Sequence, residues 1–167
     1  ALYGERIEID LNNIMYDYAD NFVEVNRGIE FEDFRFELIR EVAIEPSFDE
    51  ATYGSAKPAE LAELIVKDLK DAYARRAKSV ADTVRPVMER IYEDRKDQLD
   101  SNIYFPITDG HLGYNVPVNL LKCKNSDGAE IFRVFSKVVM FTSIDDAWRE
   151  HLREMDDLRQ SVQNATY

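Results

Sequence analysis

A seven-residue apolar repeat near the carboxyl end limits what this chain can fold into more than any other feature of its sequence. The repeat runs from Phe141 to Val162, and this spacing places its members on one face of an α-helix. Such a seam packs against another helix and does not form a small-molecule pocket. Asp127 and Glu130 form a capping signature upstream, so we expect a helix over about 127–163, roughly 55 Å long. The repeating positions are Phe141, Trp148, Met155 and Val162, with Ile144, His151 and Leu158 between them.

Most of the chain before residue 100 shows helical periodicity. Apolar side chains recur there at spacings of three and four, which is the pattern of an amphipathic helix. Pro58 suits the first turn of one such helix, whereas Pro86 disfavours helical geometry at Arg85, so we expect a kink or a break there. Ser47 and Glu50 form a capping-box pattern before a single further turn. The predicted helices cover 5–24, 31–43, 58–83 and 86–99.

Residues 102–121 change from helical to alternating periodicity. Apolar and other residues alternate on both sides of the turn dipeptide Asp109-Gly110, which predicts a β-hairpin. A two-residue turn also places Pro106 where the ladder needs an N–H group. A lone hairpin is marginally stable in water, so we expect its apolar face to pack on a helix. The predicted pairs are Phe105 with Tyr114 and Ile103 with Val116.

Composition excludes several classes of protein. Acidic residues outnumber basic residues by 33 to 21, and the net charge is −12. Because a nucleic-acid binder normally carries the opposite charge, DNA and RNA are not expected as partners. Cys123 is the only cysteine, which rules out an intrachain disulfide and fits a reducing compartment. No apolar run approaches the about 20 residues that a membrane-spanning helix needs.

The two ends of the sequence indicate a piece of a longer protein. There is no initiator Met, and helical periodicity begins within a few residues of Ala1. At the other end the periodicity continues almost to Tyr167 without a Gly or Pro that would end a helix.

Few residues in this sequence are suited to catalysis. No Gly-x-x-x-x-Gly-Lys-Ser/Thr loop is present, so this chain alone is not expected to bind ATP. His111 and His151 are its two histidines, and His151 with Glu154 supplies at most half of a carboxylate-bridged metal site. A metal-dependent helical hydrolase or oxidase needs more ligands than these, so we expect no catalytic, cofactor-binding or metal-binding residue here.

A run of residues in the last predicted helix carries a resemblance to a known family. The run reads Asp-Asp-Ala-Trp-Arg-Glu-His-Leu from Asp145, then Met155-Asp156, then Leu-Arg-Gln-Ser-Val up to Val162. It resembles the first helix of the two-helix finger of SecA-type preprotein translocases. The family pattern there is roughly Asp-x-x-Trp-Lys/Arg-Glu-His-Leu-x-x-Met-Asp-x-Leu-Arg-x-Gly/Ser-Val/Ile, and the match has no gap. The first six residues, 1–6, are similar to the end of the long scaffold helix of that family.

The resemblance implies a non-catalytic fragment of a larger motor. The expected fold is mainly α, a helical wing with a small β-hairpin insertion, flanked by two long scaffold helices. The expected parts are the end of a scaffold helix over 1–24, the wing over 25–126, and a scaffold helix with the first finger helix over 127–167. In such motors ATP and Mg²⁺ bind to domains outside this chain, and ATP hydrolysis drives preproteins through the SecY channel.

The resemblance also implies partners and a location. The partners are an unfolded preprotein, the SecY channel complex and the other domains of the parent motor. The protein would be cytoplasmic and peripherally associated with the inner face of the plasma membrane. Without a partner helix the seam would be exposed, and the fragment would then form a homodimer through it.

The residues implied for these roles lie in the last predicted helix. Tyr167 falls at the finger tip, where an aromatic side chain would contact the substrate polypeptide. Trp148 would anchor the base of the finger against neighbouring domains. The alternative is a coiled-coil interaction module of another multidomain protein, which explains the repeat but not the Trp-Arg-Glu-His-Leu run. The residues expected to pack the finger are Trp148, His151, Leu152, Met155, Leu158, Arg159 and Val162.

Overall fold

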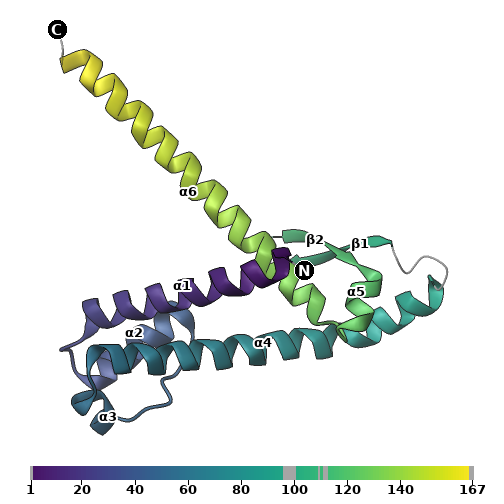
Figure 1. Ribbon diagram of the computed structural model, residues 1–167, viewed down its shortest axis with the longest axis horizontal. Coiled ribbons are helices and arrows are strands. Elements are labelled where there is room, and N and C mark those ends of the chain that lie inside the picture. Colours follow the sequence, from purple (N-terminus) through teal and green to yellow (C-terminus); the bar gives the residue numbers. More distant parts are fainter. Residues whose placement is uncertain (1, 96–100, 109, 111–112, 166–167) are drawn as a thin grey trace. The chain divides into compact units, whose positions relative to one another are not determined.

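The computed structural model describes residues 2–95, 101–108, 110 and 113–165 (Figure 1). Its fold is mainly α with one small two-stranded antiparallel sheet, which confirms the predicted fold class. The chain divides into two compact units, residues 1–76 and 77–167, and the division falls within helix α4. None of the described helices combines the length and the apolar character that crossing a membrane requires.

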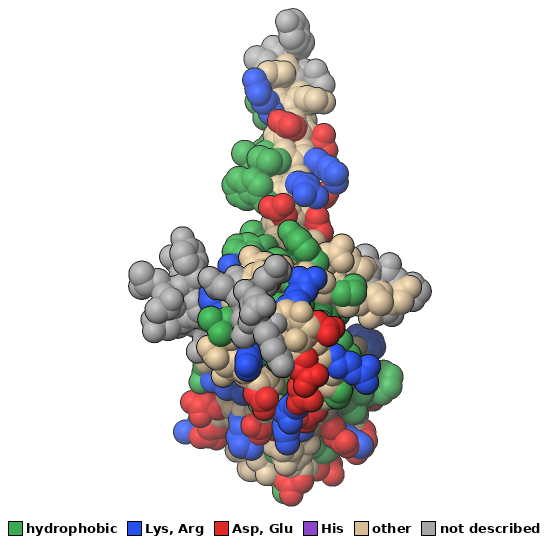
Figure 2. All heavy atoms as spheres, turned by 90° about the vertical axis from the view of Figure 1, so that its right-hand side faces the viewer, with side chains coloured by type: hydrophobic (Ala, Val, Ile, Leu, Met, Phe, Trp, Pro, Cys, Tyr) green, Lys and Arg blue, Asp and Glu red, His purple; other side chains and the backbone are tan. Residues whose placement is uncertain are grey.

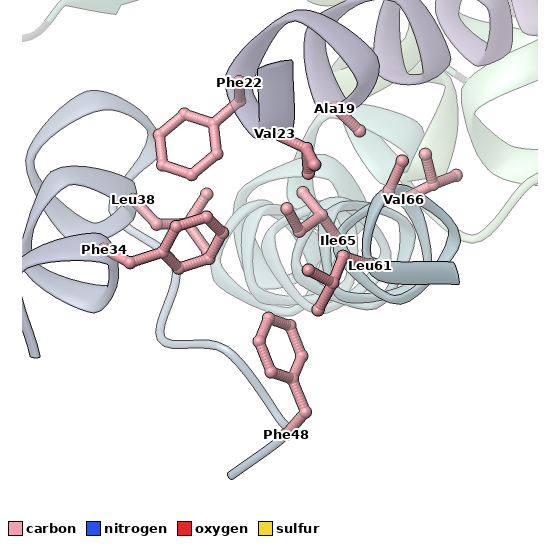
Figure 3. Close-up of a cluster of buried hydrophobic side chains, with 10 residues drawn as sticks. Ala19, Phe22, Val23, Phe34, Leu38, Phe48, Leu61, Ile65 and Val66 are labelled. Atoms are coloured by element: carbon pink, nitrogen blue, oxygen red, sulfur yellow. The ribbon is translucent and has the colours of Figure 1, made fainter. Parts of the chain in front are cut away.

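Three helices and the start of a fourth build the first unit around an aromatic core (Figure 3). Their apolar residues recur at spacings of three and four, so each helix turns one stripe inward. Phe34 is fully buried, and its ring centroid lies 5.1 Å from that of Phe22 and 4.8 Å from that of Tyr53. These helices confirm the periodicity of the first part of the sequence. They are α1 (Leu2–Asn26), α2 (Phe31–Val42), α3 (Glu50–Ser55) and α4 (Pro58–Asp94).

The start of α3 differs from the prediction. Asp49, not Ser47, is the N-cap residue, because its Oδ1 atom accepts a hydrogen bond of 2.9 Å from the backbone N–H of Thr52. The predicted capping box of Ser47 and Glu50 is therefore wrong. The backbone N–H of Ser47 instead donates to Oδ2 of Asp68 over 2.8 Å, and Asp68 is only 5% exposed. This buried carboxylate holds the loop before α3 against α4.

The second unit packs the hairpin against helices. Its core contains Val116 and Val118 from one strand together with Met88 of α4, and all three are almost fully buried. The ring of Tyr114 lies 5.9 Å from that of Phe135, so the hairpin contacts the last helix as well. The expectation that the hairpin packs on a helix is confirmed. The remaining elements are β1 (Asn102–Thr108), β2 (Gly113–Asn119), α5 (Leu120–Asn125) and α6 (Ala129–Ala165).

The register of the hairpin differs from the predicted one by two residues. Phe105 lies opposite Val116 rather than Tyr114, because the connection between the strands runs from Thr108 to Gly113 and is longer than a two-residue turn. A shift of two residues keeps every side chain on the same face of the sheet. The apolar alternation therefore fits both registers and did not distinguish them. Likewise, Ile103 pairs with Val118 in place of the predicted Val116.

Helix α4 continues through Pro86, so of the predicted kink or break the break is wrong, and the kink stays a prediction. A proline inside a helix removes one backbone hydrogen bond and strains the preceding turn. Val84 and Met88 lie on either side of it, and both are buried in the core of the second unit. Because tertiary packing supplies most of the stability of a protein helix, this burial keeps the helix continuous.

The start of α6 also corrects a prediction. Asp127 has a left-handed backbone, with φ of 54°, and does not cap the helix as predicted. Its neighbour Ser126 takes that role, since its hydroxyl oxygen accepts a hydrogen bond of 3.0 Å from the N–H of Glu130. Gly128 follows with φ of 90°, and a Cβ atom there would lie 3.4 Å from the backbone of α4. Both the conformation and the close approach favour glycine at this position.

Candidate functional site

Helix α6 is packed only near its amino end. Ile131 is fully buried in the core of the second unit, and Phe135 contacts Tyr114 edge-on. The side chains from Phe132 to Met140 are all half-buried. This first part of the helix therefore belongs to the core of the unit, and it fixes the direction in which the rest of α6 leaves that core.

The remainder of α6 exposes an apolar face. From Phe141 to Gln163 every side chain is exposed, including Trp148 at 59%. The large apolar residues among them fall at spacings of three and four, so they share one side of the helix. Figure 2 shows apolar side chains on one side of this part of α6 and charged side chains on another. We call this apolar face the seam, and its members are Phe141, Ile144, Trp148, Leu152, Met155, Leu158 and Val162.

The charged side of α6 carries ion pairs within the helix. Arg149 lies 3.4 Å from Asp145 and 3.2 Å from Asp146, and Arg153 lies 2.8 Å from Glu150. Exposed pairs of this kind contribute about 0–1 kcal/mol each, so they stabilise the helix only slightly. A contiguous apolar face opposite such a charged side is typical of a surface that another protein segment covers.

The structure brings most of the predicted packing residues together. All the apolar ones lie on the seam, and the ring of His151 lies 5.6 Å from that of Trp148. Arg159 follows Met155 by one helical turn, so it projects from the same side of the helix. Tyr167 lies outside the described residues, and its predicted contact with a polypeptide stays a prediction.

Two seam residues were not among the predicted packing residues. Phe141 and Ile144 extend the seam towards the packed part of α6, and they are 58% and 59% exposed. Both belong to the seven-residue repeat, which was the signal for them. The family-like run begins only at Asp145 and therefore left them out.

The described residues include few groups suited to metal binding or to nucleophilic catalysis. No group of three or more His, Cys, Asp or Glu residues within them is placed to hold a metal ion, and His111 lies outside the described ranges. Burial raises the pKa of the Cys123 thiol, and burial followed by its interaction with Cys123 raises the pKa of the Tyr92 hydroxyl. Both groups therefore stay protonated near neutral pH and are poor nucleophiles.

The comparison with known proteins identifies the family. The model of the "SecA Wing and Scaffold domain" matches residues 1–167. This chain belongs to the SecA family. The protein translocase subunit SecA of Parabacteroides distasonis is 38% identical over 167 residues, and that of Porphyromonas gingivalis strain W83 is 36% identical over 171. The SecA of Azobacteroides pseudotrichonymphae is 38% identical over 168 residues. No solved structure matches the chain.

The alignments with these SecA proteins cover 100% of this chain and 15% of each relative, so the chain spans a small part of their length. The resemblance inferred from the Trp-Arg-Glu-His-Leu run is confirmed, and the match extends over the whole chain. Membership of the SecA family overturns the alternative of a coiled-coil module from an unrelated protein.

Proposed function

We propose that this chain is the non-catalytic wing and scaffold part of a SecA motor, which drives preproteins through the SecY channel with energy from ATP. Two observations support the proposal: the named relatives are protein translocase subunits, and the family model matches the whole chain. The chain spans 15% of those relatives. The nucleotide-binding domains, with ATP and Mg²⁺, would lie in the rest of the parent protein.

The proposed parts follow the helices of the structure. Residues 1–24 would be the end of a scaffold helix, 25–126 the wing, and 127–167 a scaffold helix with the first finger helix. In support, α1 ends at Asn26 and α6 begins at Ala129, close to these boundaries. In this assignment α6 couples the motion of the ATPase domains to the finger.

The exposed seam of α6 is the observation that carries this function. An apolar face of this length is unfavourable in water, so it is typically covered by another protein segment. We infer that the second finger helix and neighbouring domains of the parent protein cover it, with Trp148 at the base. Tyr167, at the proposed finger tip, would contact the moving polypeptide through an amphipathic aromatic ring.

The proposed partners are an unfolded preprotein, the SecY channel complex and the other domains of the motor. Nucleic acid is not among them, because the net charge of −12 repels phosphate backbones. The parent protein would work in the cytoplasm at the inner face of the plasma membrane. The chain by itself would form a homodimer through the seam, where a second copy covers the apolar face.

A charge placed on the seam tests the proposed coupling. Replacing Met155 and Leu158 with aspartate in the full-length protein would force two carboxylates into an apolar contact, at a cost of several kcal/mol. Because about 1.4 kcal/mol corresponds to a factor of ten, we expect ATP-dependent translocation into SecY-containing vesicles to fall at least tenfold.

The control changes a charge on the charged side of the helix, where no apolar contact is proposed. Asp157→Lys alters charge at an exposed position, and translocation should stay within about twofold of the wild type, as expected for a surface substitution. Full activity of the seam variant would contradict the proposed function, as would equal losses in the two variants.

A further inference from the structure

Helix α1 carries an apolar face that is separate from the face packed in the core of the first unit. Its inward face places Phe22 and Val23 in the aromatic core of the first unit. A separate face presents Ile14, 52% exposed, and Val25, 73% exposed, with Tyr18 between them. These residues belong to a run with alternating spacings of three and four, the a and d pattern of helix–helix packing. The run, which we call the α1 stripe, is Leu11, Ile14, Tyr18, Asn21 and Val25.

The α1 stripe lines a groove. The groove has a volume of about 500 Å³, and Ile14, Tyr18, Asn21 and Val25 form much of its lining. Glu41 of α2 lies on the other side, and the hydroxyl of Tyr18 donates a hydrogen bond of 2.9 Å to its Oε2 atom. This bond fixes one carboxylate at the rim of the groove.

A row of acidic residues runs beside the stripe. Asp10, Asp17 and Glu24 are seven residues apart, so they occupy one flanking position of the same repeat, and all three are exposed. Between Asp10 and Asn26 the helix carries no Lys or Arg. Within the described part of the chain, none of the three forms an ion pair. The groove therefore combines an apolar floor with the carboxylates of Asp17 and Glu41, and Asp10 and Glu24 extend the negative charge along the same flank of α1.

We propose that this groove binds a basic amphipathic helix of a separate partner protein. A stripe with a and d spacing fits the apolar face of one helix, and an acidic flanking row favours lysine or arginine at the facing positions. Asn21, in the middle of the stripe, favours a polar side chain opposite it and so selects one register. A second copy of this chain is a poor occupant, because an antiparallel pairing would bring the acidic row against itself.

Synthetic helices test the charge and shape of the groove. One peptide of about 21 residues, long enough to hold a helix, would carry leucine at its a and d positions and lysine at its flanking positions. A second would carry glutamate in place of lysine. We expect the lysine peptide to bind the purified chain in fluorescence anisotropy, with an affinity that falls as salt rises, and the glutamate peptide to show no binding.

Variants of the chain complete this test. The double substitution D17K and E24K should weaken binding of the lysine peptide about tenfold at low salt, because it reverses one charge at the rim of the groove and one further along the acidic row. Val25→Asp should abolish binding by placing a charge on the apolar floor. The control Glu63→Lys changes an exposed carboxylate of α4 and should leave binding unchanged. Equal binding of the two peptides, or equal effects of the rim and control variants, would overturn the proposal.

A cross-link in the full-length protein identifies the source of the helix. Asn21→Cys places a thiol in the groove, and the native Cys123 is fully buried and should react little. With a photoactivatable maleimide at residue 21, the proposal expects a cross-link to a lysine- or arginine-rich helix of another polypeptide. A cross-link confined to the same polypeptide, or to a second copy, would overturn the assignment to a separate partner.

Discussion

Replacing Trp148 with alanine is expected to leave the stability of this 167-residue chain nearly unchanged and to weaken the packing of α6 in the full-length protein by about 3–5 kcal/mol. The ring is 59% exposed here and contacts only His151 among the ring pairs described for α6. Removing it from the monomeric chain should therefore change the free energy of unfolding by no more than about 0.5 kcal/mol. In the parent protein the same ring would be buried against neighbouring domains.

Two measurements separate these expectations. Denaturant unfolding gives the change in the isolated chain, and hydrogen exchange of the α6 amides gives the change in the full-length protein. Because Trp148 is the only tryptophan of the chain, its fluorescence in the monomer should be that of an indole in water and should be readily quenched by acrylamide, whereas the proposed homodimer should protect it. Sedimentation at the same concentrations distinguishes a monomer from the proposed homodimer. A loss of several kcal/mol in the isolated chain, or no loss in the full-length protein, would contradict the anchoring role.

Replacing Phe34 with alanine is expected to lower the free energy of unfolding of the first unit by about 3–5 kcal/mol, because it removes a fully buried ring. Phe34 lies among three other rings, with centroid distances of 5.1 Å to Phe22, 4.8 Å to Tyr53 and 6.4 Å to Phe48. A cavity in the middle of this group cannot be filled by rotation of one neighbour, so little of the loss is recovered. Denaturant unfolding with hydrogen exchange of the α2 amides measures the change.

The same helix supplies the control. Phe36 lies two residues further along α2 and is 62% exposed, so Phe36→Ala should change the free energy of unfolding by about 0.5 kcal/mol or less. Similar losses in the two variants would show that the core of the first unit is not arranged around Phe34.

Periodicity predicted most of the fold, because the spacing of apolar residues along a helix or a strand decides which side chains can be buried together. The seven-residue repeat correctly placed the long last helix, and alternation correctly placed the hairpin. The hairpin register was wrong because a shift of two residues leaves every apolar side chain on its face. Of the kink or break predicted at Pro86, the break was wrong because tertiary packing of Val84 and Met88, which the local sequence does not reveal, stabilises the helix on both sides.

The ends of the helices and their capping residues were harder to predict than the buried faces of the helices. Several oxygen-bearing side chains compete for each helix start, as Ser47 and Asp49 do before α3, and only the backbone conformation decides between them. Helix α5 has six residues, too few to show a period. The seam of α6 was predictable as a surface, but its exposure in this chain was not, because a repeat has the same spacing whether or not a partner covers it.

The contact between the finger tip and the moving polypeptide is the central claim, and site-specific cross-linking tests it most directly. A photoactivatable amino acid would replace Tyr167 in the full-length protein, with the same substitution at Tyr104, a hairpin residue that is 73% exposed, as the control. A preprotein would then be arrested in the SecY channel by a bulky folded tag. We predict an ATP-dependent cross-link to the preprotein from position 167 and none from position 104. No cross-link from position 167, or equal cross-links from both positions, would contradict the account.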